Sequence, residues 1–345
     1  MIQNSYLQAV SYYFPLKYNT NSDLSREHPE WSVEKIATKT GVGKRYMADE
    51  NETASDLGVE AANLLFREYQ IQKESIDYLI FCTQSPDYFL PTSACIIQDR
   101  LGLKNECGAF DFNLGCSGFV YGLALAKGLI FSNQAANVLL ITAETYTKSI
   151  HPKDKSNKTI FGDGAAAALI TSTKSERYWN AEIKEFSYHT DGKGYNKLIL
   201  KNKGFRFGHE SKSDDVYEDG VFVKNDDFIF MDGKAIFDFT AFEVPRNIEK
   251  CQLINNLSMD NVDLYIFHQA NRFMINFIRQ RCRIPEDKFL IDLADGGNTV
   301  SSTIPIALRR VIDNGFNYQH KTVLLSGFGV GLSIGTVIIQ FRDND

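Results

Sequence analysis

The sequence has few cysteines, no excess of basic residues and no long apolar run. Its 345 residues include six cysteines without a CxxC pair, which predicts neither a disulfide framework nor a zinc site. Lysine and arginine number 37 against 43 aspartates and glutamates, and the net charge of −6 argues against general nucleic-acid binding. No apolar run approaches the roughly 20 residues that a membrane helix needs, so we expect no membrane span.

The first residues, MIQNSYLQAVSYYFP, have no basic segment followed by an apolar core, so we expect no secretory signal. Cysteines that form no disulfide pattern suit a reducing compartment, and we expect a cytoplasmic protein. We also expect neither a metal nor a redox cofactor. With 43% hydrophobic and 23% charged residues, the composition is typical of a globular protein, and the length allows two domains.

The sequence contains a weak copy of itself. Three pairs of segments occur in the same order and at nearly the same spacing; they are Ser75–Cys82 with Asn261–His268, Val138–Ala143 with Val323–Phe328, and the stretches that begin at Asp111 and Asp292. Chance can supply one such pair but hardly three. The repeat predicts an α/β fold with two similar halves about a pseudo-twofold axis, residues 1–172 and residues 173–345.

Short apolar runs, many of them β-branched, predict buried strands of a sheet covered on both faces. These runs are Asp77–Phe81, Val138–Thr142, Ala165–Thr171, Leu264–Phe267, Thr322–Leu325 and Ser333–Phe341. A helical pattern in Ala54–Tyr69 follows a capping box at Thr53–Asp56, and a second helix with few polar residues follows Cys116. The polar stretch Ser172–Asp227 predicts the join between the halves and a hairpin-rich cap, at about residues 173–228.

Cys116 lies between two glycines, at the point where an apolar stretch ends and a helix of small residues begins. A helix N-terminus offers unpaired N–H groups and a partial positive charge, which lower the pKa of a thiol. The pKa can fall from about 8.5 into the range of roughly 3.5–7.5 at such a site. The pattern therefore indicates a nucleophilic cysteine, whereas most free cysteines are buried packing residues.

Two polar residues of the second half occupy places that the repeat relates to the first half. Asn298 follows Asp292 much as Cys116 follows Asp111, and His268 directly follows a predicted strand. Strand ends at one edge of an α/β sheet converge, so these three side chains can meet. The glycine-rich run Gly327–Gly335 is open to two interpretations: a loop that supplies a backbone N–H to an oxyanion hole, or a tight bulge.

Together these motifs resemble β-ketoacyl-acyl-carrier-protein synthase III, a family of thiolase-fold condensing enzymes. The resemblance runs from about residue 1 to residue 343, with the motifs in the family's order; they are Asp111–Val120, Phe161–Ala166, His268–Asn271, Gly297–Thr299 and Gly327–Gly335. It implies duplicated αβαβα halves in a five-layer sandwich, assembled as a homodimer. The first half would carry the cysteine, and the second half the histidine and the asparagine.

The resemblance implies a decarboxylative Claisen condensation. Cys116 would take an acyl group from a coenzyme A or carrier-protein thioester, and backbone N–H groups of Cys116 and Val330 would form the oxyanion hole. A malonyl thioester would then lose CO₂, and side-chain donors of His268 and Asn298 would stabilise the enolate. The product is a 3-oxoacyl thioester. An asparagine suits this role because it donates hydrogen bonds and cannot act as a base.

The resemblance also implies the binding residues. Candidates for coenzyme A are Trp31, Lys39, Lys155 and Asn271; candidates for the acyl pocket are Leu90 and Phe237; candidates for docking an acyl carrier protein are Arg272, Arg279 and Arg281. Trp31 stands farther from Lys39 than the corresponding tryptophan does in relatives. Leu90 replaces a bulky aromatic that closes the acyl pocket across the dimer interface in acetyl-specific relatives, which favours a longer or branched acyl group.

Three alternatives remain open at this point. The protein could be an acyltransferase or condensing enzyme of the same fold that serves a secondary-metabolite or surface-glycan pathway. It could be a cysteine hydrolase, because cysteine, histidine and asparagine also serve peptide cleavage. It could also be a catalytically inactive dimeric binding partner.

Overall fold

The computed structural model describes residues 4–207 and 212–343. Ten strands form one sheet in the order β14-β13-β15-β16-β8-β1-β7-β6-β4-β5. Their bounds are β1 Tyr6–Tyr13, β4 Tyr78–Cys82, β5 Gly108–Phe112, β6 Asn137–Glu144, β7 Gly164–Thr171, β8 Ala181–Thr190, β13 Leu264–Phe267, β14 Phe289–Leu290, β15 Thr322–Gly329 and β16 Ser333–Phe341. All six predicted strands are present in this sheet.

The sheet consists of two sets of five strands with the same topology. In the first set, β5, β4 and β6 are parallel and β7 and β1 follow as antiparallel neighbours; β14, β13, β15, β16 and β8 repeat this order. The repeated sequence segments occupy equivalent strands, because β4 matches β13 and β6 matches β15. The two sets meet through the pairs Tyr6–Glu182 and Leu7–Ala181 of β1 and β8.

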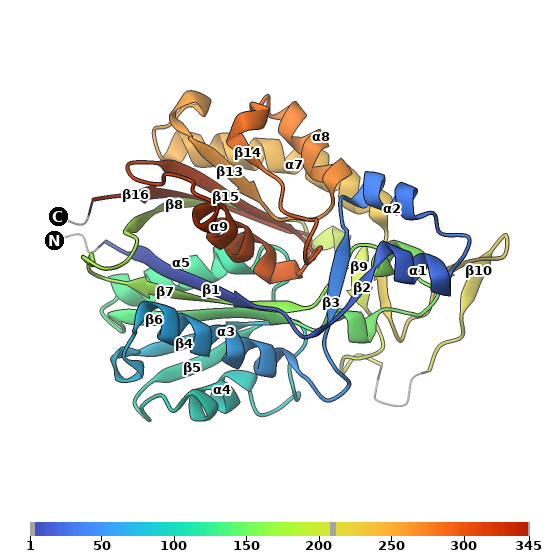
Figure 1. Cartoon of the computed structure of the whole chain (residues 1–345), viewed down its shortest axis with the longest axis horizontal. Helices are drawn as coiled ribbons and strands as arrows, with labels where there is room; N and C mark the ends of the chain where they lie inside the picture. Colours follow the sequence, from blue (N-terminus) through green and yellow to red (C-terminus); the bar gives the residue numbers. More distant parts are fainter. Residues whose placement is uncertain (1–3, 208–211, 344–345) are drawn as a thin grey trace.

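Helices cover both sets of strands and separate them, which gives five layers (Figure 1). The outer layers hold α3 (Ala54–Tyr69) with α4 (Ser93–Leu101), and α7 (Gly233–Ile254) with α8 (Arg272–Arg281). The middle layer holds α5 (Gly118–Phe131) and α9 (Thr303–Asp313), each of which contacts strands of both sets. The fold is therefore a duplicated five-layer α/β sandwich.

Local sequence explains where α3 begins and why α5 is buried. The Thr53 hydroxyl accepts the Asp56 N–H, and the Asp56 carboxylate accepts the Thr53 N–H, so the predicted capping box starts α3. In α5, apolar residues occur on all sides, and Phe119, Leu123 and Ile130 are buried between the two sets of strands. The prediction of a largely buried helix after Cys116 is confirmed.

The remaining elements form a layer at one end of the sandwich (Figure 1). They are β2 (Lys17–Thr20), α1 (Asn21–Glu27), α2 (Val33–Thr40), β3 (Lys44–Met47), α6 (Lys155–Lys158), β9 (Leu198–Leu200), β10 (Val216–Glu218), β11 (Val221–Lys224) and β12 (Ile229–Met231). The predicted cap included β8, which belongs to the central sheet because its alternate residues pack into the core. The hairpin-rich part begins after Thr190 and pairs β9 with β12 and β10 with β11.

Among the described residues, no helix is both long enough and apolar enough to span a membrane.

Candidate active site

Cys116, His268 and Asn298 line a single cavity of about 540 Å³. Cys116 lies in the loop between β5 and α5, His268 directly follows β13, and Asn298 lies in the loop between β14 and α9. The three segments converge because parallel strands of both sets end at this edge of the sandwich. The exposed fractions of 5%, 2% and 4% show that little solvent reaches these side chains.

The glycine-rich run of the second half packs directly against Cys116. A Cβ atom on Gly327 would lie 2.7 Å from the Cys116 carbonyl oxygen, and a Cβ atom on Gly329 would lie 2.7 Å from the Cys116 Sγ. Gly329 also has a φ of 157°, which disfavours other residues. The glycines therefore permit a close approach of this strand to the thiol, and the next residue is Val330.

Burial raises the pKa of the Cys116 thiol to about 12. The nearby Glu144 carboxylate also raises the pKa, whereas hydrogen bonds from the Val330 and Cys116 backbone N–H groups lower it. The expectation of a pKa below that of a free cysteine is wrong, because the cost of placing a thiolate in this apolar site exceeds the stabilisation by N–H groups. The resting side chain is a thiol at neutral pH.

His268 is held as a neutral imidazole. Burial lowers its pKa to about 3, although a hydrogen bond with the Val300 backbone acts in the opposite direction. Its Nδ1 lies 2.8 Å from the Thr303 hydroxyl, at the start of α9, and its ring packs edge-on against Phe328. This environment fixes the ring plane and makes an imidazolium unfavourable near neutral pH.

Asn298 is fixed through both its backbone and its side chain. Its N–H donates to the Ile160 carbonyl at 3.0 Å, and its carbonyl accepts the Gly162 N–H at 3.1 Å. Its Oδ1 accepts the Val300 N–H at 2.9 Å, so the amide nitrogen is the end that remains for other partners. The Nδ2 group lies 3.4 Å from the Ala270 carbonyl, a long contact that leaves donor capacity.

Four predicted binding residues line the same cavity. Lys39 of α2 and Lys155 of α6 are exposed cations at its wall, Asn271 caps α8, and Phe237 of α7 stacks on Phe273. Two lysines from different helices beside an apolar cavity suit a ligand with a phosphate-bearing end and an apolar end.

The other predicted binding residues lie outside this cavity. Trp31 is 3% exposed and stacks on His28, with the Lys155 ammonium over its ring at 5.5 Å. Arg272 is exposed and packs against Gly41 at the end of α2, close to Lys39. Arg279 and Arg281 lie in the last turn of α8, where they contact the Ile284 carbonyl and the Phe242 ring.

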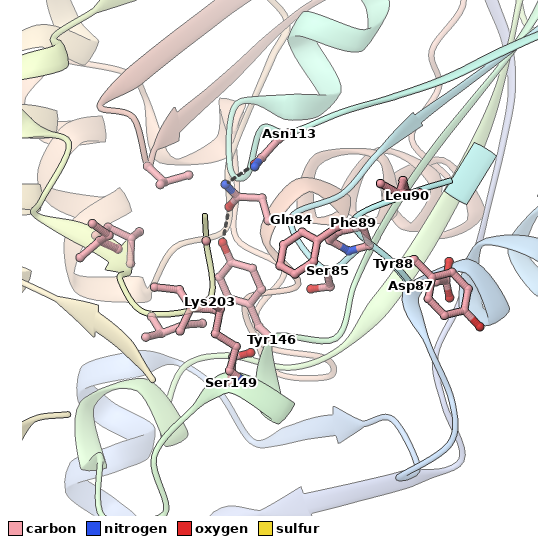
Figure 2. Close-up of a pocket in the computed structure, with 17 residues that line it drawn as sticks. Gln84, Ser85, Asp87, Tyr88, Phe89, Leu90, Asn113, Tyr146, Ser149 and Lys203 are labelled. Atoms are coloured by element: carbon pink, nitrogen blue, oxygen red, sulfur yellow. Dashed lines mark hydrogen bonds between the residues drawn. The ribbon is translucent and has the colours of Figure 1, made fainter. Parts of the chain in front are cut away.

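A second cavity, of about 870 Å³, adjoins the first (Figure 2). Leu198 lines both cavities, and Val330 lines the second. Leu90 lines it as well and is 80% exposed. Figure 2 shows a chain of hydrogen bonds along one wall, from Tyr146 to the Gln84 amide oxygen and from the Gln84 amide nitrogen to Asn113.

Sequence reasoning missed several residues that shape this site. Thr303 and Phe328 contact His268, Gln84 and Tyr146 line the second cavity, and Arg45 packs against Gly297 in the loop that carries Asn298. Phe328 lies inside the glycine-rich motif Gly327–Gly335, and Thr303 lies four residues after the motif Gly297–Thr299, so the motifs themselves could have pointed to both. Nothing in the sequence distinguishes Arg45 or Tyr146 from other arginines and tyrosines.

Within the described ranges, no group of three or more histidine, cysteine, aspartate or glutamate side chains could hold a metal ion. The six cysteines are all free.

A duplicated five-layer sandwich with a buried thiol at the start of a middle-layer helix is the fold of the thiolase-like condensing enzymes. Two family models match the chain: the 3-oxoacyl-[acyl-carrier-protein] synthase III model over residues 110–192, and the model of the C-terminal part of the same family over residues 254–341. The chain belongs to the 3-oxoacyl-[acyl-carrier-protein] synthase III family.

Similar proteins extend this match over the whole chain. The β-ketoacyl-[acyl-carrier-protein] synthase III of Clostridium perfringens is 35% identical, covering 98% of this chain and all of the relative. Synthase III 2 of Staphylococcus epidermidis is also 35% identical, covering 97% and 98%.

Solved structures agree with the sequence matches. A crystal structure of a 3-oxoacyl-(acyl-carrier-protein) synthase III superposes with a TM-score of 0.94 at 41% identity, covering 98% of this chain and 100% of that chain. The synthase from Burkholderia xenovorans has a TM-score of 0.87 at 29% identity, covering 98% and 94%.

Proposed function

We propose that the protein catalyses the decarboxylative condensation of an acyl thioester with a malonyl thioester, giving a 3-oxoacyl thioester and CO₂. The observation that carries this proposal is the single cavity lined by Cys116, His268 and Asn298. A thiol and two neutral side chains are what the two chemical steps need, and the names of the relatives agree with this reaction. The names of these relatives do not favour the alternatives of a cysteine hydrolase, a catalytically inactive binding partner or an enzyme of a secondary-metabolite or surface-glycan pathway.

In the first step the Cys116 sulfur attacks the acyl carbonyl. A bond forms between sulfur and the acyl carbon, the bond to the departing thiol breaks, and the proton of Cys116 ends on that thiol. Because Cys116 rests as a thiol, it must lose this proton while the new bond forms. The backbone N–H groups of Cys116 and Val330, which already stabilise a thiolate, are the donors that we assign to the carbonyl oxygen.

In the second step the malonyl thioester loses CO₂, and the electron pair of the broken bond moves onto the thioester oxygen. His268 and Asn298 donate hydrogen bonds to this enolate, which stabilises it without a full positive charge. Only one of the two nitrogens of a neutral imidazole donates, and we assign the donor to Nε2. The Thr303 hydroxyl, which lies 2.8 Å from Nδ1 and 3.1 Å from the Val300 carbonyl, holds the ring in place. The enolate carbon then attacks the acyl group, and the Cys116 sulfur leaves and regains a proton.

Lys39 and Lys155 are the groups that we assign to the phosphates of coenzyme A, because both are exposed cations at the cavity wall. Trp31 is a weaker candidate for the same ligand because His28 and Lys155 already contact its ring. Arg272 makes the start of α8 basic, and Arg279 and Arg281 make its last turn basic, which suits an acidic acyl carrier protein. No resident cofactor is required by this chemistry.

A homodimer is part of this proposal. Strand β5 ends the sheet and pairs only with β4 among the described residues, so its outer edge can pair with a second copy. Tyr88, Phe89 and Leu90 are exposed beside the second cavity, and a partner subunit would cover them. We assign the enzyme to acyl transfer and to the cytoplasm, where its six free cysteines would stay reduced.

The second cavity is the place that we assign to the far end of a longer or branched acyl group. It has the size of a typical ligand pocket, it shares Leu198 with the Cys116 cavity, and it is lined by Val330, whose backbone hydrogen-bonds Cys116. Leu90 and Phe237 are the acyl-contact candidates, on the second and the first cavity respectively.

The test measures the two steps separately. Intact-protein mass spectrometry reports the acyl group on the enzyme, and release of labelled CO₂ from a malonyl thioester reports decarboxylation. We expect Cys116→Ala to abolish acylation, and His268→Ala and Asn298→Ala to acylate normally while CO₂ release falls on the order of 10²–10³-fold. Parental CO₂ release in both of the latter variants would refute the assigned roles.

A further inference from the structure

Residues 43–47, which include strand β3, form a strap that packs against the loop that carries Asn298. The Gly43 and Lys44 N–H groups donate to the Ala294 carbonyl at 2.9 and 3.1 Å, and the Gly296 N–H donates to the Lys44 carbonyl at 3.2 Å. On the other side, the Asp163 N–H donates to the Tyr46 carbonyl at 2.9 Å. The strap therefore joins a loop of each half, the one before β7 and the one before α9.

Arg45 lies at the centre of this strap, and its side chain is directed inward. It is 2% exposed and is the largest fully buried side chain among the described residues. Its Nε and Nη2 both donate to the Thr159 carbonyl, at 2.9 and 2.7 Å. No carboxylate accompanies it: Arg45 has no ion pair in the described part of the chain, and its Nη1 has no hydrogen-bond partner there.

A buried guanidinium without a counter-charge is costly, so an apolar residue would pack here at lower cost. The arginine instead donates to the Thr159 carbonyl, which accepts no backbone N–H from the described loops and turns. Thr159 directly follows α6 as its C-cap residue, and the carbonyls at the end of a helix have no N–H partner inside the helix. Two donors on one oxygen fix the direction of that carbonyl more firmly than a single donor would.

The aliphatic part of the Arg45 side chain also packs against two glycines next to Asn298: Gly297, which precedes it, and Gly162, which donates to its carbonyl. A Cβ atom on Gly162 would lie 3.4 Å from the Arg45 Cβ, and a Cβ atom on Gly297 would lie 3.5 Å from its Cγ. The same atoms would lie only 2.4 Å from the Gly296 carbonyl and 2.7 Å from the Ile160 carbonyl. The packing leaves the segment little room to shift while Arg45 is in place.

One short path leads from this guanidinium to the amide of Asn298. Arg45 holds the carbonyl of Thr159, the next residue accepts the Asn298 N–H, and Gly162 donates to the Asn298 carbonyl. We propose that Arg45 is a positioning residue, which sets the place of the Asn298 side chain through the segment Thr159–Gly162. This inference rests on the role proposed above for Asn298 in decarboxylation.

The test replaces the guanidinium and compares the two steps. Arg45→Met keeps most of the stem and removes the donors. We expect Cys116 acylation within about threefold of the parent and CO₂ release lower by roughly 10- to 100-fold, because a displacement of about 1 Å can cost this much. Acyl and malonyl thioesters of N-acetylcysteamine are used, so that a shift of Lys155 on α6 cannot affect phosphate binding.

Two further variants separate positioning from general destabilisation. Arg45→Lys restores one donor and should recover part of the CO₂ release, whereas Arg309→Met removes a largely buried arginine that contacts Glu68, Asp313 and the Val10 carbonyl. Arg309→Met should lower the Tm without changing the ratio of the two rates. If Arg45→Met does not fold, the ratio in Arg45→Lys decides alone.

The outcomes distinguish this inference from the proposed function. If Asn298→Ala loses CO₂ release but the Arg45 variants keep the parental ratio of the two rates, the positioning role is refuted and the function stands. If Asn298→Ala keeps its CO₂ release, the proposed function itself fails. A reduced ratio in Arg45→Met with partial recovery in Arg45→Lys supports both.

Discussion

Cys116 and Asn298 occupy equivalent places in the two halves, between an edge strand and a middle-layer helix, but they are held there differently. Cys116 lies two residues before α5 and is enclosed by Gly327 and Gly329 of the second half. Asn298 is followed by a short turn before α9 and pairs with Ile160 and Gly162 of the first half. Each half therefore fixes the reactive loop of the other.

This exchange explains why a duplicated fold has one active site. In the proposed function, the first half would supply the nucleophile at the position where the second half supplies an amide, so neither half alone would contain a complete set. His268, in contrast, is held within its own half by Thr303 and Phe328. Contacts between the halves should consequently matter more for activity than contacts inside one half, and the following predictions test this difference.

The largest effect is expected for Gly329→Ala. The new methyl group would lie 2.7 Å from the Cys116 Sγ at a φ of 157°, so the thiol or the strand must move. We expect acylation of Cys116 to fall by at least about 100-fold, in line with the cost of small misplacements. Mass spectrometry of the acyl-enzyme measures the rate, and Gly102→Ala, which meets no neighbour at a helix end, controls for strain at a positive φ.

The pH dependence should differ between the two steps, because burial raises the pKa of Cys116 in the first half and lowers the pKa of His268 in the second half. With a raised pKa of about 12, Cys116 gains thiolate as the pH rises through 7–9, so acylation should rise without a plateau. The gain is less than tenfold per pH unit because Glu144, whose pKa is raised to about 8, becomes anionic in this range and raises the pKa of Cys116. With a lowered pKa of about 3, His268 stays neutral above pH 5, so CO₂ release should be flat from pH 5 to 8. A plateau in acylation below pH 8 would contradict the first expectation.

Thr303→Val should have a smaller effect than Gly329→Ala, because this contact lies within one half. The valine removes the hydroxyl that lies 2.8 Å from His268 Nδ1 but keeps the volume of the side chain. We expect CO₂ release to fall about tenfold, the cost of losing a charge-neutral hydrogen bond, while acylation is unchanged. Thr303→Ser keeps the hydroxyl and is the matched control; equal losses in both variants would exclude the hydrogen bond as the cause.

The smallest effect concerns Leu90, which lies outside the nucleophile cavity. Leu90→Phe should lower acylation by hexanoyl relative to acetyl thioesters by a few-fold, if a partner subunit brings this residue to the acyl chain. Leu16→Phe is the control, because Leu16 is 87% exposed, close to the 80% of Leu90, and lines neither cavity. A parent enzyme that strongly prefers acetyl over butanoyl and hexanoyl would contradict the expected acyl preference.

The sequence predicted much of this architecture because the repeat carries it. The matched segments identified β4 with β13 and β6 with β15, and apolar runs identified the buried strands. The family resemblance added the five layers. The predicted cap wrongly included β8, because β8 alternates polar and apolar residues. A half-exposed strand of this kind resembles a strand of a hairpin when its neighbours are unknown.

The properties of the site were less predictable than its residues. The pKa of Cys116 depends on how completely Gly329, Val330 and the surrounding apolar residues exclude water, and no local pattern gives that. A helix N-terminus was visible in the sequence, but the depth of burial was not. Arg45 was missed for the same reason, because its partner is a backbone carbonyl more than a hundred residues away.

The middle-layer helix α5 has a consequence for biosynthesis. Its apolar surface is covered on one side by β15 and β16, which follow the other described strands in the sequence. At about 5–20 residues per second, the ribosome needs roughly 10–40 s between the end of this helix and the start of β15. During that time the nascent first half exposes the apolar surface of α5 that β15 and β16 later cover. A chain truncated before residue 322 should therefore recruit chaperones or aggregate.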